Sequence, residues 1–109
     1  MEIRCNNNRL IIMKRNRIYV INVKDLLYIE RTGNHSSIQT TTRRITVSLS
    51  LKRIFVMLPN NFVRSHKSFI INKNLIIQIN PLNTNTVECI FEGDKSALIT
   101  KNQVEIIIG

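Results

Sequence analysis

Glycine, cysteine and acidic residues are scarce in this 109-residue chain, and each shortage excludes a class of site. The three glycines are far apart, so the closely spaced glycines of a phosphate-binding loop or a dinucleotide fingerprint are absent. Cys5 and Cys89 have no CxxC spacing, and together with His35 and His66 they match no known metal-ligand pattern. Two isolated thiols of this kind favour reduced core residues of a cytoplasmic protein, and no metal or cofactor is expected.

Long apolar runs are also missing. No stretch approaches the roughly 18 apolar residues that span a bilayer, and the N-terminus alternates charged and apolar residues, unlike a signal peptide. The chain has no internal repeat, low-complexity stretch or linker. We therefore expect a single domain over residues 1–109, located in the cytoplasm and without a membrane partner.

The acidic residues do not suggest catalysis. Asp25, Asp94 and five glutamates are the only acids, and none sits beside a histidine in the sequence. Ser65 or Ser68 with His66 and a distant acid could in principle form a nucleophilic triad. The GxSxG turn that presents such a serine is absent, so we predict no enzymatic activity and no small-molecule substrate.

Positive charge is what the chain has in excess. Between Arg31 and Val87 there are eight Lys or Arg residues and no Asp or Glu, and the net charge of the chain is +9. A surface of one sign repels itself and disfavours the compact state, unless a polyanion relieves the repulsion. Nucleic acid is the first candidate. An anionic membrane is disfavoured because the basic residues do not lie along one amphipathic helix, and an acidic protein is the alternative.

Short β-branched or apolar runs recur every eight to twelve residues, which predicts a β-dominated domain. Gly33 and Asn34 tolerate the positive φ values of a tight hairpin turn. The stretch Thr86–Phe91 is expected to pair with Lys95–Ile99. The other expected strands are Ile3–Cys5, Leu10–Met13, Ile18–Ile21, Leu26–Glu30, Ser37–Thr41 and Leu75–Asn80.

One short amphipathic helix is predicted over about residues 50–58. Ser48 or Ser50 can cap its start, and Pro59 stops it. Four apolar residues share one face at the spacing i, i+3, i+4 and i+7, namely Leu51, Ile54, Phe55 and Leu58. The C-terminal segment allows two structures, because Thr100 and Gln103 have the spacing of a helix capping box, while the β-branched residues 106–108 favour a last strand.

The segment from Phe62 to Asn72, Phe-Val-Arg-Ser-His-Lys-Ser-Phe-Ile-Ile-Asn, is the most informative part of the chain. Its aromatic residues can point inward from a strand and turn. His66 is expected to be a structural histidine that donates hydrogen bonds to nearby backbone. Lys67 has no obvious carboxylate partner in its acid-free neighbourhood, so it either lies in solvent or meets a phosphate or a base edge.

Several segments, in this order and spacing, resemble the LytTR-type DNA-binding domain, which is found mainly at the C-terminus of bacterial response regulators. They are Leu26–Glu30, Gly33-Asn34-His35, the helix that begins at Ser50-Leu51 and ends at Leu58-Pro59, and Phe62–Asn72. The resemblance covers nearly the whole chain. It implies an elongated, mainly β fold of several small antiparallel sheets, whose loops, rather than a recognition helix, enter successive major grooves of promoter DNA.

The resemblance also implies how such a domain acts. The chain is expected to be a transcription regulator, either the output domain of a two-component phosphorelay system or a stand-alone protein. Its partner is expected to be double-stranded DNA with paired direct repeats, bound as a homodimer. A non-catalytic module that binds an acidic protein or an RNA is the competing class.

Three base-reading positions follow from the resemblance. The first lies in the hairpin loop after Leu26–Glu30, where either His35 or Ser36 is the reader. The second is Lys67. The third follows the last strand, at Lys101 and Asn102, where relatives often have Arg. Lys is a point charge and Arg reads guanine bidentately, so the base preference of the relatives does not carry over to this position.

Phosphate or positioning contacts are expected from Asn34, Arg43, Arg44 and Arg64. For Arg64, packing and phosphate positioning are equally compatible with the sequence. Arg43 and Arg44 are expected in a turn, facing phosphate or solvent. Arg15 and Arg17 lie in another turn and are expected to be a solvated edge.

Overall fold

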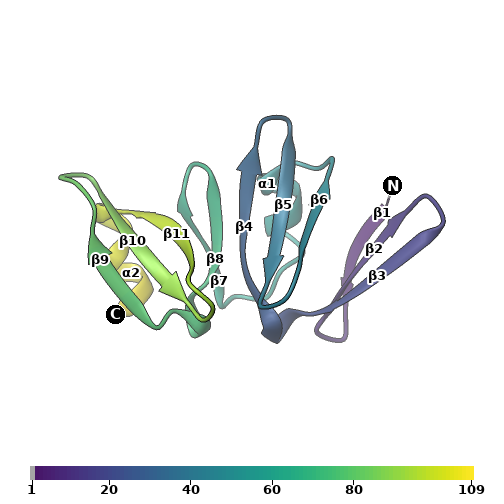
Figure 1. Ribbon diagram of the computed structural model, residues 1–109, viewed down its shortest axis with the longest axis horizontal. Coiled ribbons are helices and arrows are strands. Elements are labelled where there is room, and N and C mark those ends of the chain that lie inside the picture. Colours follow the sequence, from purple (N-terminus) through teal and green to yellow (C-terminus); the bar gives the residue numbers. More distant parts are fainter. Residues whose placement is uncertain (1) are drawn as a thin grey trace.

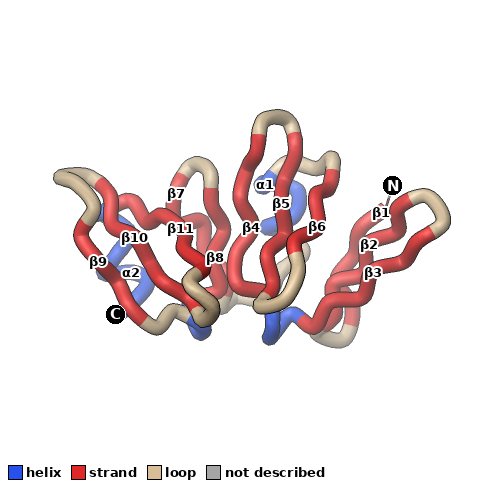
Figure 2. Tube along the Cα trace, viewed as in Figure 1, coloured by secondary structure: helices blue, strands red, loops and turns tan. Residues whose placement is uncertain are grey.

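The computed structural model, which describes residues 2–109, has three small antiparallel sheets arranged along one long axis (Figures 1 and 2). The extents of the molecule are 44 × 25 × 24 Å. Strands make up most of the chain, and the helices are short. The elongated, mainly β architecture predicted from the sequence is therefore confirmed.

The N-terminal sheet is a meander in the order β1-β2-β3, formed by β1 (Glu2–Asn6), β2 (Arg9–Lys14) and β3 (Arg17–Asn22). Asn7 and Asn8 form the first turn with φ values of 53° and 61°, a conformation that asparagine tolerates and that matches the twist of a tight hairpin. A 3₁₀ turn, η1 (Val23–Asp25), leads into the central sheet.

The central sheet has the order β6-β5-β4-β8-β7. Its strands are β4 (Leu26–Thr32), β5 (His35–Thr40), β6 (Arg44–Val47), β7 (Phe62–His66) and β8 (Phe69–Asn72). Strand β6 was not expected from the sequence, although it alternates between exposed and buried residues, with Ile45 and Val47 inside. The turn predicted around Arg43 and Arg44 is therefore shorter than expected.

Helix α1 (Leu51–Phe55) crosses behind the central sheet (Figure 1). The Ser50 hydroxyl caps it by accepting a hydrogen bond from the backbone N–H of Arg53 at 3.2 Å. The helix is shorter than the predicted 50–58 because its last turn tightens: the amide of Leu58 bonds to the carbonyl of Phe55 at 3.1 Å, a 3₁₀-type bond.

The C-terminal sheet has the order β11-β10-β9, with β9 (Gln78–Pro81), β10 (Thr86–Phe91) and β11 (Lys95–Thr100). The predicted pairing of β10 with β11 is confirmed. The strand expected over 75–80 is partly wrong: Asn72 Oδ1 accepts a hydrogen bond from the Asn74 amide at 3.1 Å, which bends the chain into η2 (Lys73–Leu75) and delays the strand.

The chain ends in η3 (Lys101–Gln103) and α2 (Val104–Ile108), so the helical alternative for the C-terminus is correct. The predicted capping box is not formed, because the Thr100 side chain makes no cap hydrogen bond. The 3₁₀ turn of η3 leads directly into the helix instead.

Two apolar cores lie on the two faces of the central sheet. One joins that sheet to the N-terminal sheet and α1, with Leu10, Ile12, Ile29 and Ile54 fully buried. The other joins it to the C-terminal sheet and α2, and its centre is the tilted pair of Tyr28 and Phe91, whose ring centroids are 5.4 Å apart.

Both cysteines are free thiols, as predicted, and the structure places them in different sheets. Cys5 is half-buried in β1, whereas Cys89 is fully buried in β10. Burial raises the pKa of the Cys89 thiol to about 12, which leaves it protonated and chemically inert at neutral pH.

Candidate nucleic-acid interface

One long side of the molecule collects most of the connections that the sequence predicts to be functional (Figure 1). Neighbouring strands run antiparallel, so alternate connections fall on the same side. We call this side the loop face. It is formed by the connections around Arg15-Asn16 (β2–β3), Gly33-Asn34 (β4–β5), Ser48–Ser50 (β6–α1), Lys67-Ser68 (β7–β8), Asn83–Asn85 (β9–β10) and Lys101-Asn102 (after β11).

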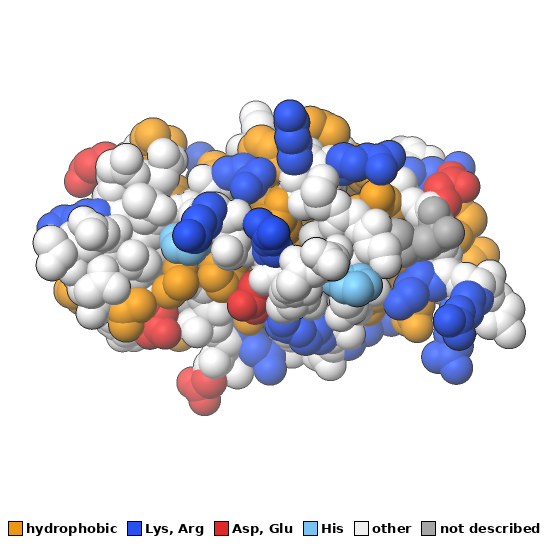
Figure 3. Space-filling model, turned by 90° about the horizontal axis from the view of Figure 1, so that it is seen from above, with side chains coloured by type: hydrophobic (Ala, Val, Ile, Leu, Met, Phe, Trp, Pro, Cys, Tyr) orange, Lys and Arg blue, Asp and Glu red, His pale blue; other side chains and the backbone are white. Residues whose placement is uncertain are grey.

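Positive charge is spread along the loop face. Figure 3, which views this side from above, shows Lys and Arg side chains over much of its length, few acidic side chains, and both histidines of the chain. The acid-free interval between Arg31 and Val87 includes the β4–β5, β6–α1, β7–β8 and β9–β10 loops, which explains this distribution. Such a surface attracts a polyanion along its long axis.

The β4–β5 loop presents His35 and not Ser36. Gly33 (φ 64°) and Asn34 form the turn, and Asn34 and His35 are exposed. Ser36 is 1% exposed, and its hydroxyl donates a hydrogen bond to the carbonyl of Leu49. The sequence left these two residues as alternatives, and the structure offers only His35 to a ligand on this surface.

A bulge in β7 shapes the second loop. Arg64 pairs with Ile70 and His66 pairs with Phe69, so Ser65 is the extra residue. Ser65 is fully buried and donates to the carbonyl of Leu98 at 2.8 Å, which ties the central sheet to β11. The bulge therefore fixes the loop that carries Lys67 against the C-terminal sheet.

His66 has a structural role, but not through the donated hydrogen bond that the sequence predicted. Its Nδ1 accepts a hydrogen bond from the backbone N–H of Ser68 at 3.1 Å. Its ring packs edge-on against the ring of Phe69, with the two ring centroids 5.9 Å apart. Burial, and then the charge of Lys67, lower the pKa of His66 below its usual value. The ring is therefore a neutral acceptor that holds the turn.

Lys67 and Asn102 meet across a shallow depression of 270 Å³ between the β7–β8 loop and η3. Arg64 and His66 also line it, and none of its lining residues is acidic. Arg64 donates from Nη2 to the carbonyl of Lys67 at 3.3 Å, which steadies the loop. The second and third predicted reading positions thus form one surface.

Lys101 lies beside Asn102 and connects this surface to another loop. Its backbone N–H donates to the carbonyl of Asn85 at 2.9 Å, so the β9–β10 loop adjoins η3. The β9–β10 loop is not among the contacts predicted from the sequence, although its run Asn83-Thr-Asn85 is typical of a polar turn.

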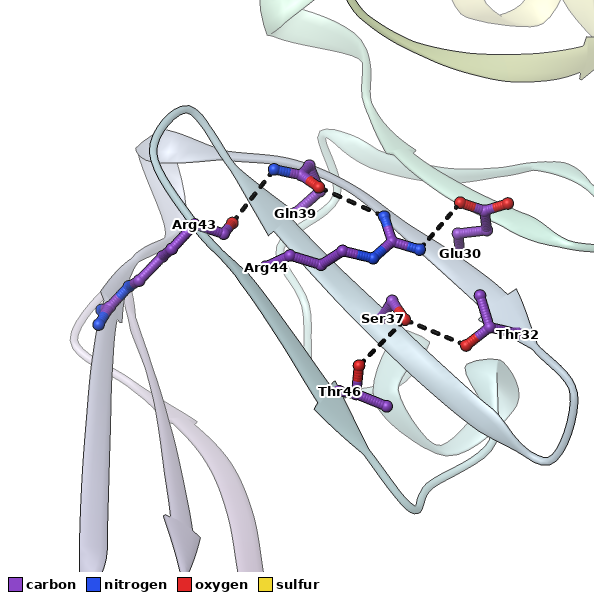
Figure 4. Close-up of polar contacts among 7 residues, drawn as sticks. All are labelled: Glu30, Thr32, Ser37, Gln39, Arg43, Arg44 and Thr46. Atoms are coloured by element: carbon purple, nitrogen blue, oxygen red, sulfur yellow. Dashed lines mark hydrogen bonds and ion pairs between the residues drawn. The ribbon is translucent and has the colours of Figure 1, made fainter.

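Arg43 and Arg44 have partners within the protein (Figure 4). Arg44 forms an ion pair with Glu30 at 3.3 Å and donates to Gln39 Oε1 at 3.3 Å. Arg43 donates from Nη2 to the carbonyl of Val20 at 2.8 Å, which links the central and N-terminal sheets. The β5–β6 turn that carries Arg43 lies on the side away from the loop face, so a phosphate contact by this residue stays a prediction without geometric support.

The sequence matches a known domain family. The sequence profile of the LytTr DNA-binding domain matches residues 16–107. The chain therefore belongs to the LytTr DNA-binding domain family, and its general function is DNA binding.

Curated relatives are transcriptional and signalling proteins of bacteria. The transcriptional regulatory protein NatR of Bacillus subtilis is 36% identical over 91% of this chain, and the sensory transduction protein LytT of the same species is 32% identical over 72%. The transcriptional regulatory protein YpdB of Escherichia coli is 30% identical over 73%. The chain spans 43%, 33% and 33% of the lengths of these relatives.

A solved structure has the same fold. It is described as the LytTr DNA-binding domain of a methyl-accepting/DNA response regulator from Bacillus cereus, and it matches with a TM-score of 0.80 at 18% identity, covering 95% of this chain and 99% of that one. At this identity the likeness concerns the fold alone.

Over residues 2–109, no helix is long and apolar enough to cross a membrane. Nor do three or more His, Cys, Asp or Glu side chains within that range group as a metal site would require.

Proposed function

We propose that this chain is the DNA-reading part of a bacterial transcription regulator and that its loop face enters successive major grooves of double-stranded DNA. The long axis of 44 Å supports this geometry, because the major groove recurs once per helical turn, about 34–36 Å. Loops spread along that axis can reach two grooves on one side of a duplex. Paired direct repeats, each bound by one copy, are the proposed operator.

The observation that carries the proposal is the shared depression of Lys67 and Asn102. A Lys ammonium donates to the O6 and N7 acceptors of guanine, and an Asn amide pairs bidentately with adenine, so the two side chains offer different base preferences at neighbouring positions. His35 supplies the reading group of the β4–β5 loop, and Lys101 adds charge beside Asn102.

Arg64 and Asn34 are proposed as phosphate or positioning contacts. The Nε–H of Arg64 is buried and has no hydrogen-bond partner among the described residues. Arg64 also lines the depression, and its guanidinium, which donates from Nη2 to the carbonyl of Lys67, has further N–H donors for a phosphate oxygen there. Asn34 is exposed next to His35, where its amide can donate to the backbone of the same groove.

The test is a fluorescence-anisotropy titration with a direct-repeat duplex and a scrambled duplex at about 50–200 mM salt. We expect preference for the repeats and a steep salt dependence. Lys67→Ala should lose about 1–3 kcal/mol of discrimination between the duplexes. Lys73→Ala, which removes an exposed lysine of η2 away from the loop face, is the matched control and should keep the discrimination.

Three outcomes would contradict the proposal in different ways. If Lys67→Ala lowered the affinity for both duplexes equally, Lys67 would have no role in reading bases. If the parent protein bound both duplexes with the same affinity and the same steep salt dependence, it would be only a general polyanion binder. A shallow salt dependence on any nucleic acid would favour the competing class, a module for an acidic protein.

A further inference from the structure

The tip of the β2–β3 hairpin is a basic element that none of the predicted contacts uses. Lys14, Arg15 and Arg17 are close together there, and Asn16 is the remaining turn residue. The family match begins at residue 16, inside this turn, so Arg15 lies just outside the matched residues. The hairpin tip emerges on the loop face, at one end of the long axis (Figure 1).

Arg15 lies next to the proposed reader of the β4–β5 loop. A depression of 420 Å³ separates the hairpin from the central sheet, and it is lined by Lys14, Arg15, His35, Thr46 and Ser48. No acidic residue lines it. Arg15 thus faces the same surface as His35 without a carboxylate in that depression to neutralise its charge, unlike Arg44, which is paired with Glu30.

Two contacts hold the hairpin in this position. At the tip, Lys14 Nζ donates to the carbonyl of Thr46 in β6 at 2.9 Å. Farther along β3, Arg43 donates to the carbonyl of Val20 at 2.8 Å. The tip is therefore fixed relative to the β4–β5 loop, and a ligand that contacts both does not have to order the hairpin first.

The backbone of Arg15 is unusual for its residue type. Its φ is +53°, in the left-handed region that glycine and asparagine adopt at lower cost. Asparagine occupies the corresponding conformations in the β1–β2 turn, at Asn7 and Asn8. A non-glycine residue in such a conformation is a candidate functional position, because strained residues cluster at binding sites.

We infer that Arg15 binds a DNA phosphate that flanks the bases read by the β4–β5 loop, with Lys14 holding the hairpin against β6. The inference rests on the proposed function and extends its footprint to the end of the molecule. At about 3.4 Å per base pair, the 44 Å length corresponds to about 13 base pairs. Arg15 would contact the backbone near one end of that span.

Arg15→Asn is the decisive variant, because it removes the charge and suits the left-handed backbone, so the fold should be at least as stable. Lys24→Asn is the matched control: it removes one charge from η1, where Lys24 lines a different depression with Asn7 and Asn8. Binding of both variants and the parent protein to the direct-repeat duplex is measured by anisotropy between 50 and 200 mM salt.

For Arg15→Asn we expect the slope of log K against log salt to be smaller by about 0.9, the value for one lost phosphate contact. Its affinity relative to the parent protein should then change by about 3.5-fold between 50 and 200 mM salt. Lys24→Asn should keep the parental slope. On a duplex trimmed at the hairpin end, Arg15→Asn and the parent protein should bind equally.

An unchanged slope for Arg15→Asn would overturn the inference. Equal changes in the two variants would also overturn it, since they would reflect net charge rather than a contact. Failure of the parent protein to bind any duplex would instead refute the proposed function, so the two failures are distinguishable.

Discussion

Replacing Asn72 with alanine would remove three hydrogen bonds from the junction of the central sheet. The side chain is 2% exposed; its Nδ2 donates to the carbonyl of Leu26 at 3.0 Å. Its Oδ1 accepts from Asn61 Nδ2 at 2.8 Å and from the Asn74 amide at 3.1 Å. One buried amide therefore ties β4, β8, η2 and the segment before β7 together.

The size of the effect follows from these contacts. Each intramolecular hydrogen bond contributes about 1 kcal/mol net, and a buried group left unpaired costs more, so Asn72→Ala should lower the free energy of unfolding by about 3 kcal/mol. Domains of this size have about 5–15 kcal/mol in total. The melting temperature should fall by roughly 12–24 °C.

Equilibrium unfolding in urea measures this directly, with an unchanged m-value as the sign that both states remain comparable. Asn74→Ala is the control: Asn74 is exposed, and its side chain makes no hydrogen bond with the described residues, so the change should be within about 0.5 kcal/mol. A loss below about 0.5 kcal/mol for Asn72→Ala would refute the reasoning. Below its melting temperature the variant should bind DNA as the parent protein does, because Asn72 lies at the end of β8 away from the loop face.

Two further predictions concern the loop and the sheet junction. Because the pKa of His66 is lowered on folding, the unfolded chain binds a proton first as the pH falls through about 6.5, so the free energy of unfolding should decrease below that pH. His66→Gln should show a smaller decrease between pH 7.5 and 5.5, and an identical decrease would exclude His66 as the cause. Arg43→Ala should lose about 1 kcal/mol of stability, from the bond to Val20, with an unchanged salt slope for DNA binding. A smaller slope with unchanged stability would make Arg43 a phosphate contact.

Much of the fold could be predicted because its signals are local. Alternation in the β10–β11 hairpin, the Gly33-Asn34 turn and the apolar stripe of α1 each depend on residues close in sequence. The signals failed where a single long-range or side-chain bond competed, as in the Asn72 bond that bends the chain into η2.

The site divides in the same way. From the sequence alone, the family resemblance predicted Lys67 and the Lys101-Asn102 pair as base readers, and the acid-free interval around Lys67 supported the first of these predictions. Only the tertiary structure brought Lys67 and Asn102 to one depression, turned Ser36 inward while leaving His35 exposed, and moved Arg15 beside His35. The physical reason is that charge and periodicity are properties of a segment, whereas exposure and pairing depend on which distant strand covers it. The side chain of Arg43, for example, is paired with the carbonyl of Val20 in β3, which lies 23 residues away in the sequence.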